Sequence, residues 1–260
     1  RTKNPNMGYQ SNIIVPLYVY PSLGAWSPLE EVVLAYSNIQ FTIIINPGNG
    51  PGSSILPDAN YTRAIVILSS YDNVRLIGYV HTSYAKRNVS MICRDIETYA
   101  AWPVKSTNPD LAVRGIFFDE TPQQYDADSF AYLQRLSEFV KSPRGLGSDS
   151  YIVHNPGAVP DPRYLPTADS TVVFEETYST FQDRYGAGLF TEILDTSNAR
   201  RAVLIHSVPV SVTGSKLQDL ITAVRKVAND VFITHLETDC YASFGPKWAD
   251  FVDLMDGDLR

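Results

Sequence analysis

Residues 115–122, with the sequence GIFFDETP, decide how this chain is interpreted. A short apolar run stops at two adjacent carboxylates, Asp119 and Glu120, and Pro122 follows closely. Short apolar runs are typical of buried strands, and proline cannot donate a hydrogen bond to a neighbouring strand. The stretch therefore predicts a core strand that emerges at the surface at Asp119 and Glu120.

A second apolar run ends in the same way, in residues 172–177 with the sequence VVFEET. Glu175 directly follows the apolar residues, and Glu176 comes next. A single acidic residue at a strand end is more often a turn former or a helix cap than a catalyst. Two such strand ends in one chain favour a shared site. Glycoside hydrolysis needs this pair, with one carboxyl group as proton donor and one as nucleophile or base.

The composition limits the classes of protein to which the chain can belong. Its 260 residues suit one large α/β domain or two small ones, and a hydrophobic content of 44% suffices for a sizeable core. The net charge of -7 disfavours nucleic acid as a partner, because phosphates attract basic surfaces. The 16 tyrosines suit sugar binding, since the ring packs on apolar faces while the hydroxyl bonds polar groups. Most of them are nevertheless expected to fill core and sheet surfaces.

Cysteine content, hydropathy and short motifs bear on the environment of the chain. Cys93 and Cys240 are too few for a disulfide framework or a zinc site. One bridge could join them, but their expected positions in a helix and a loop favour free thiols. No apolar run of about 18 residues is present, so attachment to a membrane would need an anchor before Arg1. The sequons at Asn60 and Asn88 fit a secreted or cell-surface protein.

Apolar runs alternate with helical patterns along the whole chain. The predicted strands are residues 13–20, 41–46, 74–80, 113–119, 151–154, 171–175, 202–206 and 231–234. The predicted helices are residues 28–37, 60–70, 89–101, 127–139, 181–194, 217–227 and 248–255. The proline-rich segment 155–170 leaves room only for a brief or irregular helix. Eight strands that alternate with helices over this length predict an α/β fold, a single-domain (β/α)8 TIM barrel.

The main alternative is an open, doubly wound sheet. Such a sheet usually carries a G-x-G-x-x-G turn after its first strand, and residues 21–26, with the sequence PSLGAW, lack that pattern. The glycine-rich segment 47–52, PGNGPG, follows the second predicted strand and lacks the Gly-Lys-Ser/Thr of a phosphate-binding loop. The barrel is therefore the preferred fold.

A TIM barrel carries its active site at the carboxyl ends of its strands. All four histidines fall at predicted strand ends, which random placement would not produce; they are His81, His154, His206 and His235. Polar and aromatic side chains able to bond sugar hydroxyl or acetamido groups gather at the same ends. The substrate-binding candidates are Tyr18, Tyr20, Asn46, Tyr79, His81 and Asn155.

Other catalytic chemistries lack their usual patterns. Metal sites in barrels favour His-x-His pairs, and neither this pattern nor His-Glu-x-x-His occurs. No Gly-x-Ser-x-Gly elbow marks a nucleophilic serine, and neither cysteine has an electropositive setting. We therefore predict no catalytic metal and no cofactor, and we expect carboxylates to carry the chemistry.

Four segments together resemble the spherulin-4 family, also called glycoside hydrolase family 135. They are residues 14–21 (IVPLYVYP), 45–52 (INPGNGPG), 78–82 (GYVHT) and 115–120 (GIFFDE), and the similarity extends over essentially the whole chain. The resemblance implies a (β/α)8 barrel and a fungal, endo-acting glycosidase. Its substrate would be galactosaminogalactan, an exopolysaccharide of α-1,4-linked galactose and N-acetylgalactosamine. The family's essential acidic residues correspond to Asp119, Glu120 and Glu175.

The residues and the resemblance point to the same groups. We expect Asp119 to be the nucleophile and Glu175 the general acid and base, because the fourth and sixth strands bring both over the centre of the barrel. Glu120 would orient Asp119 or bond the sugar, since adjacent strand residues point to opposite faces. Which of the two adjacent carboxylates is the nucleophile stays open at this point.

The expected outcome is retention of anomeric configuration, because the short Asp119 side chain is held close to its strand, although sequence alone leaves inversion open. We expect the protein to act as a monomer on a polysaccharide. Two alternatives from other classes are a non-catalytic carbohydrate-binding barrel and a metal-dependent polysaccharide deacetylase. A binder does not need two acids that straddle one bond, and this separates it from the enzyme.

Overall fold

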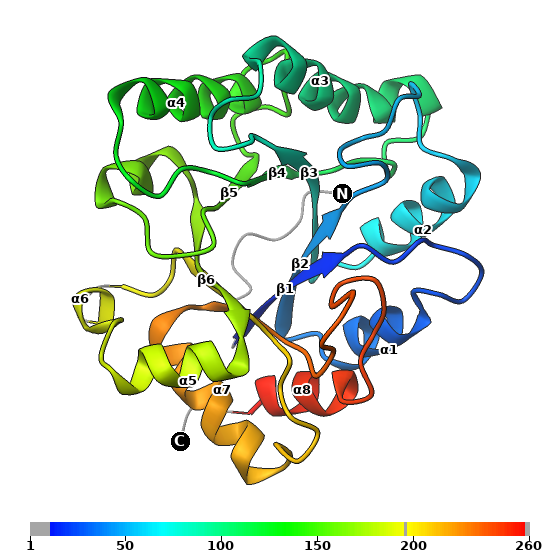
Figure 1. Cartoon of the computed structure of the whole chain (residues 1–260). Coiled ribbons are helices and arrows are strands. Elements are labelled where there is room, and N and C mark those ends of the chain that lie inside the picture. Colours follow the sequence, from blue (N-terminus) through cyan, green and yellow to red (C-terminus); the bar gives the residue numbers. More distant parts are fainter. Residues whose placement is uncertain (1–10, 195–196, 258–260) are drawn as a thin grey trace.

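The eight predicted strands close into a barrel. The computed structural model describes residues 11–194 and 197–257. Strands β1 to β8 pair in chain order, all in parallel, and β1 closes the ring against β8. The helices surround the strands on the outside (Figure 1). The fold is the predicted (β/α)8 TIM barrel, and the closed ring rules out the open, doubly wound sheet.

The elements alternate as the sequence indicates. The strands are β1 (Ser11–Leu17), β2 (Ile39–Ile45), β3 (Val74–His81), β4 (Gly115–Asp119), β5 (Tyr151–Asn155), β6 (Ser170–Thr177), β7 (Arg201–His206) and β8 (Asp230–Ile233). The helices are α1 (Ser27–Ala35), α2 (Ala59–Ser69), α3 (Val89–Ser106), α4 (Ala127–Lys141), the 3₁₀ helix η1 (Pro162–Thr167), α5 (Tyr178–Gly186), α6 (Thr191–Leu194), α7 (Ser215–Val227) and α8 (Trp248–Met255). The short η1 confirms the brief helix expected between β5 and β6.

The predicted helix over residues 181–194 is wrong in its extent, because the structure has two helices there. The first, α5, begins earlier, since the side chain of Thr177 accepts a hydrogen bond from the backbone N–H of Thr180 and caps the helix. Glycine is a poor helix former, and this segment contains Gly186 and Gly188. Gly188 adopts a left-handed φ of 70°, which ends the helical path before α6 begins.

Helix α3 packs directly against the strand that carries one of the site tyrosines. A Cβ atom at Gly78 would lie 2.7 Å from the ring of Tyr99, so only glycine lets the two elements approach this closely. The Tyr99 hydroxyl donates to the carbonyl oxygens of Ile45 at 3.2 Å and Tyr79 at 3.0 Å. Since side chains alternate along a strand, Gly78 faces α3 and Tyr79 faces the barrel interior.

The cysteines and the sequon asparagines all lie within the described residues. Cys93 in α3 and Cys240 in the loop before α8 are free thiols, as predicted. Asn88 is exposed at the start of α3, and Asn60 is partly buried in the first turn of α2. Glycosylation at these positions stays a prediction. Within residues 11–194 and 197–257, no helix combines the length and the hydropathy needed to cross a membrane.

A buried carboxyl group at the amino-terminal end of the barrel makes stability depend on pH. Asp230 is buried, and burial raises its pKa from 3.8 to about 6. The folded state therefore holds this proton more tightly than the unfolded chain does. Protonated Asp230 therefore contributes up to about 3 kcal/mol to the free energy of unfolding. This contribution is complete below about pH 4 and is lost as the pH rises through about 6. We expect Asp230→Asn to remove this loss, which urea unfolding at pH 4, 5, 6 and 7 would detect. If Asp230→Asn had the same pH dependence as the wild type, Asp230 would not be the group responsible.

Candidate active site

Two carboxylates from different strands face the interior at the carboxyl end of the barrel. Asp119 ends β4, and in the parallel register it lies beside Asn155, which ends β5. Glu175 lies near the end of β6. The preceding Phe174 packs outside the sheet against Phe181 of α5 and Phe190 of the following turn, so alternation turns Glu175 inward and Glu176 outward. This resolves the ambiguity between the two adjacent glutamates in favour of Glu175.

Asn155 joins the two carboxylates. Its side-chain nitrogen donates to Asp119 Oδ1 at 2.8 Å and to Glu175 Oε2 at 2.6 Å. These two oxygens are consequently at most about 5.4 Å apart, the sum of the two bonds. The amide orientation is determined locally, because Asn155 Oδ1 accepts the backbone N–H of Gly157 at 3.0 Å. Asn155 was predicted to bind substrate, and the structure places its amide between the predicted catalytic groups.

Three tyrosines surround the carboxylate pair. The Tyr79 hydroxyl donates to Asp119 Oδ2 at 2.7 Å, and the Tyr241 hydroxyl donates to Glu175 Oε1 at 2.6 Å. The ring of Tyr18 contacts both other rings edge-on, with centroids 5.7 Å away in each case. Burial and the negative charges of the two carboxylates raise the pKa of all three hydroxyl groups. The tyrosines therefore remain protonated and can act as hydrogen-bond donors.

Glu175 lies in an environment that favours its protonated form. Loss of contact with water raises the pKa of the Glu175 carboxyl, and the nearby charge of Asp119 raises it further. The hydrogen bonds from Tyr241 and Asn155 act in the opposite direction, as does His206. The net effect is a raised pKa, which suits a group that must deliver a proton.

Glu120 occupies a strained turn beside Asp119. Its φ is 55°, a left-handed conformation that is uncommon for a residue with a side chain. The backbone N–H of Glu120 donates to Asp119 Oδ1 at 2.9 Å, and its carbonyl accepts from Tyr84 N and Thr82 Oγ1. Ser83, Tyr84 and Ala85 also have positive φ values. The Glu120 backbone thus holds Asp119 Oδ1 in place, and the catalytic role of Glu120 stays a prediction.

Three of the predicted binding residues form hydrogen bonds with nearby loop residues on the same face. The Tyr20 hydroxyl donates to Asp58 Oδ2 at 3.0 Å, in front of α2. Asn46 Oδ1 accepts the backbone N–H of Gly50 at 2.8 Å and so organises the glycine-rich loop. His81 ends β3, where the parallel register places it beside Asp119, and its ring bonds Ser83 Oγ. Roles for these residues in sugar binding stay predictions.

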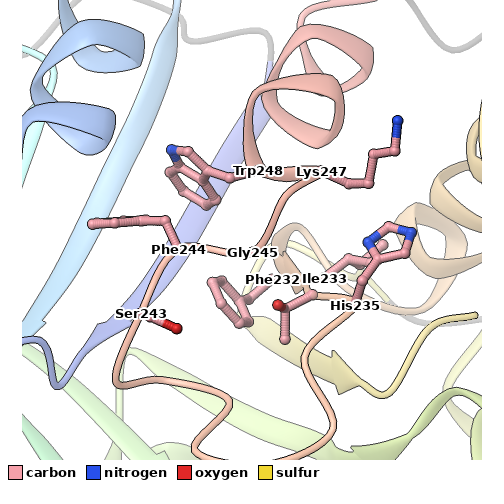
Figure 2. Close-up of a pocket in the computed structure, with 9 residues that line it drawn as sticks. Phe232, Ile233, His235, Ser243, Phe244, Gly245, Lys247 and Trp248 are labelled. Carbon is pink, nitrogen blue, oxygen red and sulfur yellow. The ribbon is translucent and has the colours of Figure 1, made fainter. Parts of the chain in front are cut away.

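The four histidines do not share one site. In the register of β4 and β5, His154 is paired with Phe118, so both point outward, away from the barrel interior. Burial there lowers the pKa of His154 to about 3. His235 lies beyond β8 and lines a small pocket together with Phe244 and Trp248 (Figure 2). Neither Asp119 nor Glu175 is among the lining residues. His206, at the end of β7, is close enough to Glu175 to lower the pKa of the Glu175 carboxyl. The position of all four histidines at strand ends therefore does not place all four of them in the carboxylate site.

No metal centre can be assembled from the described residues. Within residues 11–194 and 197–257, no three His, Cys, Asp or Glu side chains lie in an arrangement that could hold an ion.

The residue that sequence reasoning missed is Tyr241. It lies in the loop between β8 and α8 and follows no apolar strand run, so no strand-end signal marked it.

The fold and the site define the chain as a (β/α)8 barrel protein with a bridged pair of carboxylates at the carboxyl ends of its strands. Residues 12–255 match the family model called Spherulation-specific family 4, and the chain belongs to this family. Spherulin-4 from Physarum polycephalum is 36% identical over 175 residues. The match covers 67% of this chain and 48% of that protein, so it spans about half the length of this relative. The resemblance drawn from the four sequence segments is confirmed.

Two solved structures resemble the chain, one in sequence and fold and the other in fold alone. The crystal structure of Aspergillus clavatus Sph3 in complex with GalNAc is 62% identical in sequence, with a TM-score of 0.92. The match covers 96% of this chain and 99% of Sph3. The endo-beta-1,4-mannanase of Thermotoga petrophila shares only 10% identity at a TM-score of 0.54, over 95% of this chain and 74% of the mannanase. At that identity the likeness concerns the barrel fold alone.

Proposed function

We propose that this protein is an endo-acting glycoside hydrolase that cleaves α-1,4-linked, N-acetylgalactosamine-containing exopolysaccharide, of which galactosaminogalactan is the expected example. The observation that carries the proposal is the carboxylate pair bridged by Asn155. Retaining glycosidases hold their two carboxyl groups about 5–5.5 Å apart, whereas inverting enzymes hold them roughly 6.5–9.5 Å apart. The upper bound set by the two bonds of Asn155 favours the retaining spacing.

In the first step, Asp119 attacks the anomeric carbon while Glu175 protonates the glycosidic oxygen. The bond between carbon and leaving oxygen breaks, a covalent glycosyl ester forms on Asp119, and Glu175 becomes a carboxylate. The hydrogen bonds from Tyr79, Asn155 and the Glu120 N–H hold Asp119 in place for this attack. The raised pKa of Glu175 supplies the proton that the leaving group needs.

In the second step, the carboxylate of Glu175 removes a proton from water as the water attacks the ester. The sugar leaves with its original anomeric configuration, Asp119 is released, and Glu175 regains its proton. One residue thus acts first as acid and then as base. Tyr18 contacts the rings of both positioning tyrosines and is our candidate for direct contact with the sugar in this step.

One observation favours GalNAc units in the substrate, and a second favours a long polymer. Sph3, with which the chain shares 62% of its sequence, was crystallised in complex with GalNAc. Exposed tyrosines also lie on three different loops at the carboxyl end of the barrel, where they could stack on sugar rings beyond the cleavage point. They are Tyr20, Tyr84 and Tyr125. A polymer that reaches these loops would be cut internally, in agreement with endo action.

The location of the protein follows from its substrate. An exopolysaccharide lies outside the cell, so we propose a secreted or cell-surface protein that works as a monomer. The exposed sequon at Asn88 fits passage through the secretory pathway. Treatment of the native protein with an N-glycosidase, followed by mass spectrometry, would test this.

We expect the purified protein to shorten α-1,4-linked GalNAc oligosaccharides, as seen by mass spectrometry, and to do so at an unchanged rate after treatment with EDTA. The reason is that the proposed chemistry uses two carboxylates and needs no metal. Loss of acetyl groups without shortening, dependent on added zinc, would instead identify a deacetylase. Tight binding without any conversion would identify a non-catalytic carbohydrate-binding barrel.

A further inference from the structure

Glu175 has two different hydrogen-bond partners, and only one of them can serve both states of an acid–base residue. Asn155 presents its NH₂ group, because its own carbonyl oxygen is occupied by the N–H of Gly157. An amide NH₂ can only donate, whereas a tyrosine hydroxyl can donate and accept. Oε2, which faces Asn155, therefore remains an acceptor in both states. The exchangeable proton belongs on Oε1, which faces Tyr241.

We propose that Tyr241 is a positioning residue for Glu175, which alternates between donating to the carboxylate and accepting from the carboxylic acid as catalysis proceeds. The inference rests on the proposed function for the two chemical steps. When Glu175 is protonated and no substrate is bound, its O–H group points to the Tyr241 oxygen, and in the reactive complex the O–H bond turns to the glycosidic oxygen. When that proton passes to the leaving oxygen, the Tyr241 hydroxyl turns and donates to the new carboxylate. No proton is lost or gained by Tyr241 in either step.

The surroundings of Tyr241 fit this role. Its ring is held edge-on by Tyr18 on one side and Phe232 on the other, with both centroids 5.7 Å away. Burial and the charge of Glu175 raise the pKa of the Tyr241 hydroxyl, so that it keeps its proton at any working pH. The ring is fixed while the O–H bond can rotate. This is what a partner must do if it is to exchange the roles of donor and acceptor.

Other groups also act on Glu175 and must be held constant in a test. The titratable groups that affect it, or are affected by it, come from the loop after β1, from β3, β4 and β7, and from the loop before α8; they are Tyr18, Tyr79, Asp119, His206, Cys240 and Tyr241. Tyr241→Phe keeps the ring and its edge contacts and removes only the hydroxyl. Tyr185→Phe is the matched control, because the ring of Tyr185 stacks on Phe181 in the outer layer of the barrel.

The first readout does not need activity. Titration of protein carrying ¹³C-labelled glutamate carboxyls, with the Glu175 signal assigned from Glu175→Gln, gives the pKa of Glu175 directly. Tyr241→Phe should raise this pKa, because the ionised carboxyl loses a stronger hydrogen bond than the neutral acid does, while Tyr185→Phe should leave it unchanged. An unchanged pKa in Tyr241→Phe would overturn the proposal, whatever the enzyme cleaves.

The second readout is kinetic. We expect Tyr241→Phe to lower kcat on GalNAc oligosaccharides by roughly 10- to 100-fold, the cost of one hydrogen bond to a charged group. The alkaline limb of kcat/KM should move to higher pH. A 2,4-dinitrophenyl glycoside of the same oligomer needs no proton donor, so release of its phenolate should slow much less. Equal losses on both substrates with an unmoved limb would show a merely structural role. Absence of cleavage by the wild type would reject the proposed function. The role of Tyr241 would then be tested by the NMR titration alone.

Discussion

Asp119→Asn and Glu175→Gln are each expected to fold normally and to lose at least about a thousandfold in kcat on α-1,4-linked GalNAc oligosaccharides. The two exchanges keep side-chain size and remove, respectively, the nucleophile and the exchangeable proton. Initial rates by reducing-end assay and thermal unfolding of each variant would measure both effects. Either variant retaining a tenth of wild-type turnover would show that the roles are assigned wrongly.

Glu176→Gln is the matched control for this pair. Glu176 is adjacent to Glu175 and exposed, and its carboxylate accepts the backbone N–H of Thr177. Its side chain points away from the barrel interior, because side chains alternate along β6. We expect turnover within a factor of about two of the wild type, since surface substitutions of this kind change stability by less than about 0.5 kcal/mol.

Asn155→Asp should be nearly as damaging as loss of a catalytic group. The new side chain cannot donate to Asp119 or Glu175 and adds a third negative charge between them, where like charges disfavour ionisation. We expect kcat at neutral pH to fall by on the order of a hundredfold or more, because general acid–base catalysis alone contributes that much. Asn155→Ala, without the extra charge, should be less impaired than Asn155→Asp at neutral pH, and the two variants should become more alike as the pH falls and the new carboxyl is protonated.

Asn108→Asp makes the same chemical change at a distance from the site. Asn108 lies in the loop between α3 and β4, and its oxygen already accepts the backbone N–H of Asp110, which an aspartate can also do. We expect wild-type kinetics for this control. Full activity of Asn155→Asp would mean that the bridge between the carboxylates has no part in catalysis.

The barrel could be predicted from sequence because its determinants are local. Short apolar runs and helical patterns alternate, and each run became a strand. The carboxylates were found for the same reason, since Asp119 and Glu175 each follow an apolar run directly. The break between α5 and α6 was missed because hydrophobic periodicity outweighed two glycines, although Gly188 in a left-handed conformation cannot continue a helix.

The interior of the site was harder to predict, because it depends on register between strands. His154 and Asn155 are neighbours in sequence, yet only Asn155 points inward, and that follows from its pairing with Asp119. Tyr241 reaches Glu175 from a loop separated from it by 66 positions in the chain. A loop of this kind has no periodicity that would reveal its partner, so its contribution required the folded chain.

The measurement that tests the central claim most directly is proton NMR of the wild-type enzyme acting on an α-1,4-linked GalNAc oligosaccharide. Spectra taken before mutarotation report the configuration of the first new reducing end. A carboxylate pair joined by one amide should act by two displacements. We therefore expect the α-anomer to form first and the β-anomer to grow in afterwards. Initial formation of the β-anomer would contradict the retaining mechanism, and the absence of any new reducing end would contradict glycoside hydrolysis itself.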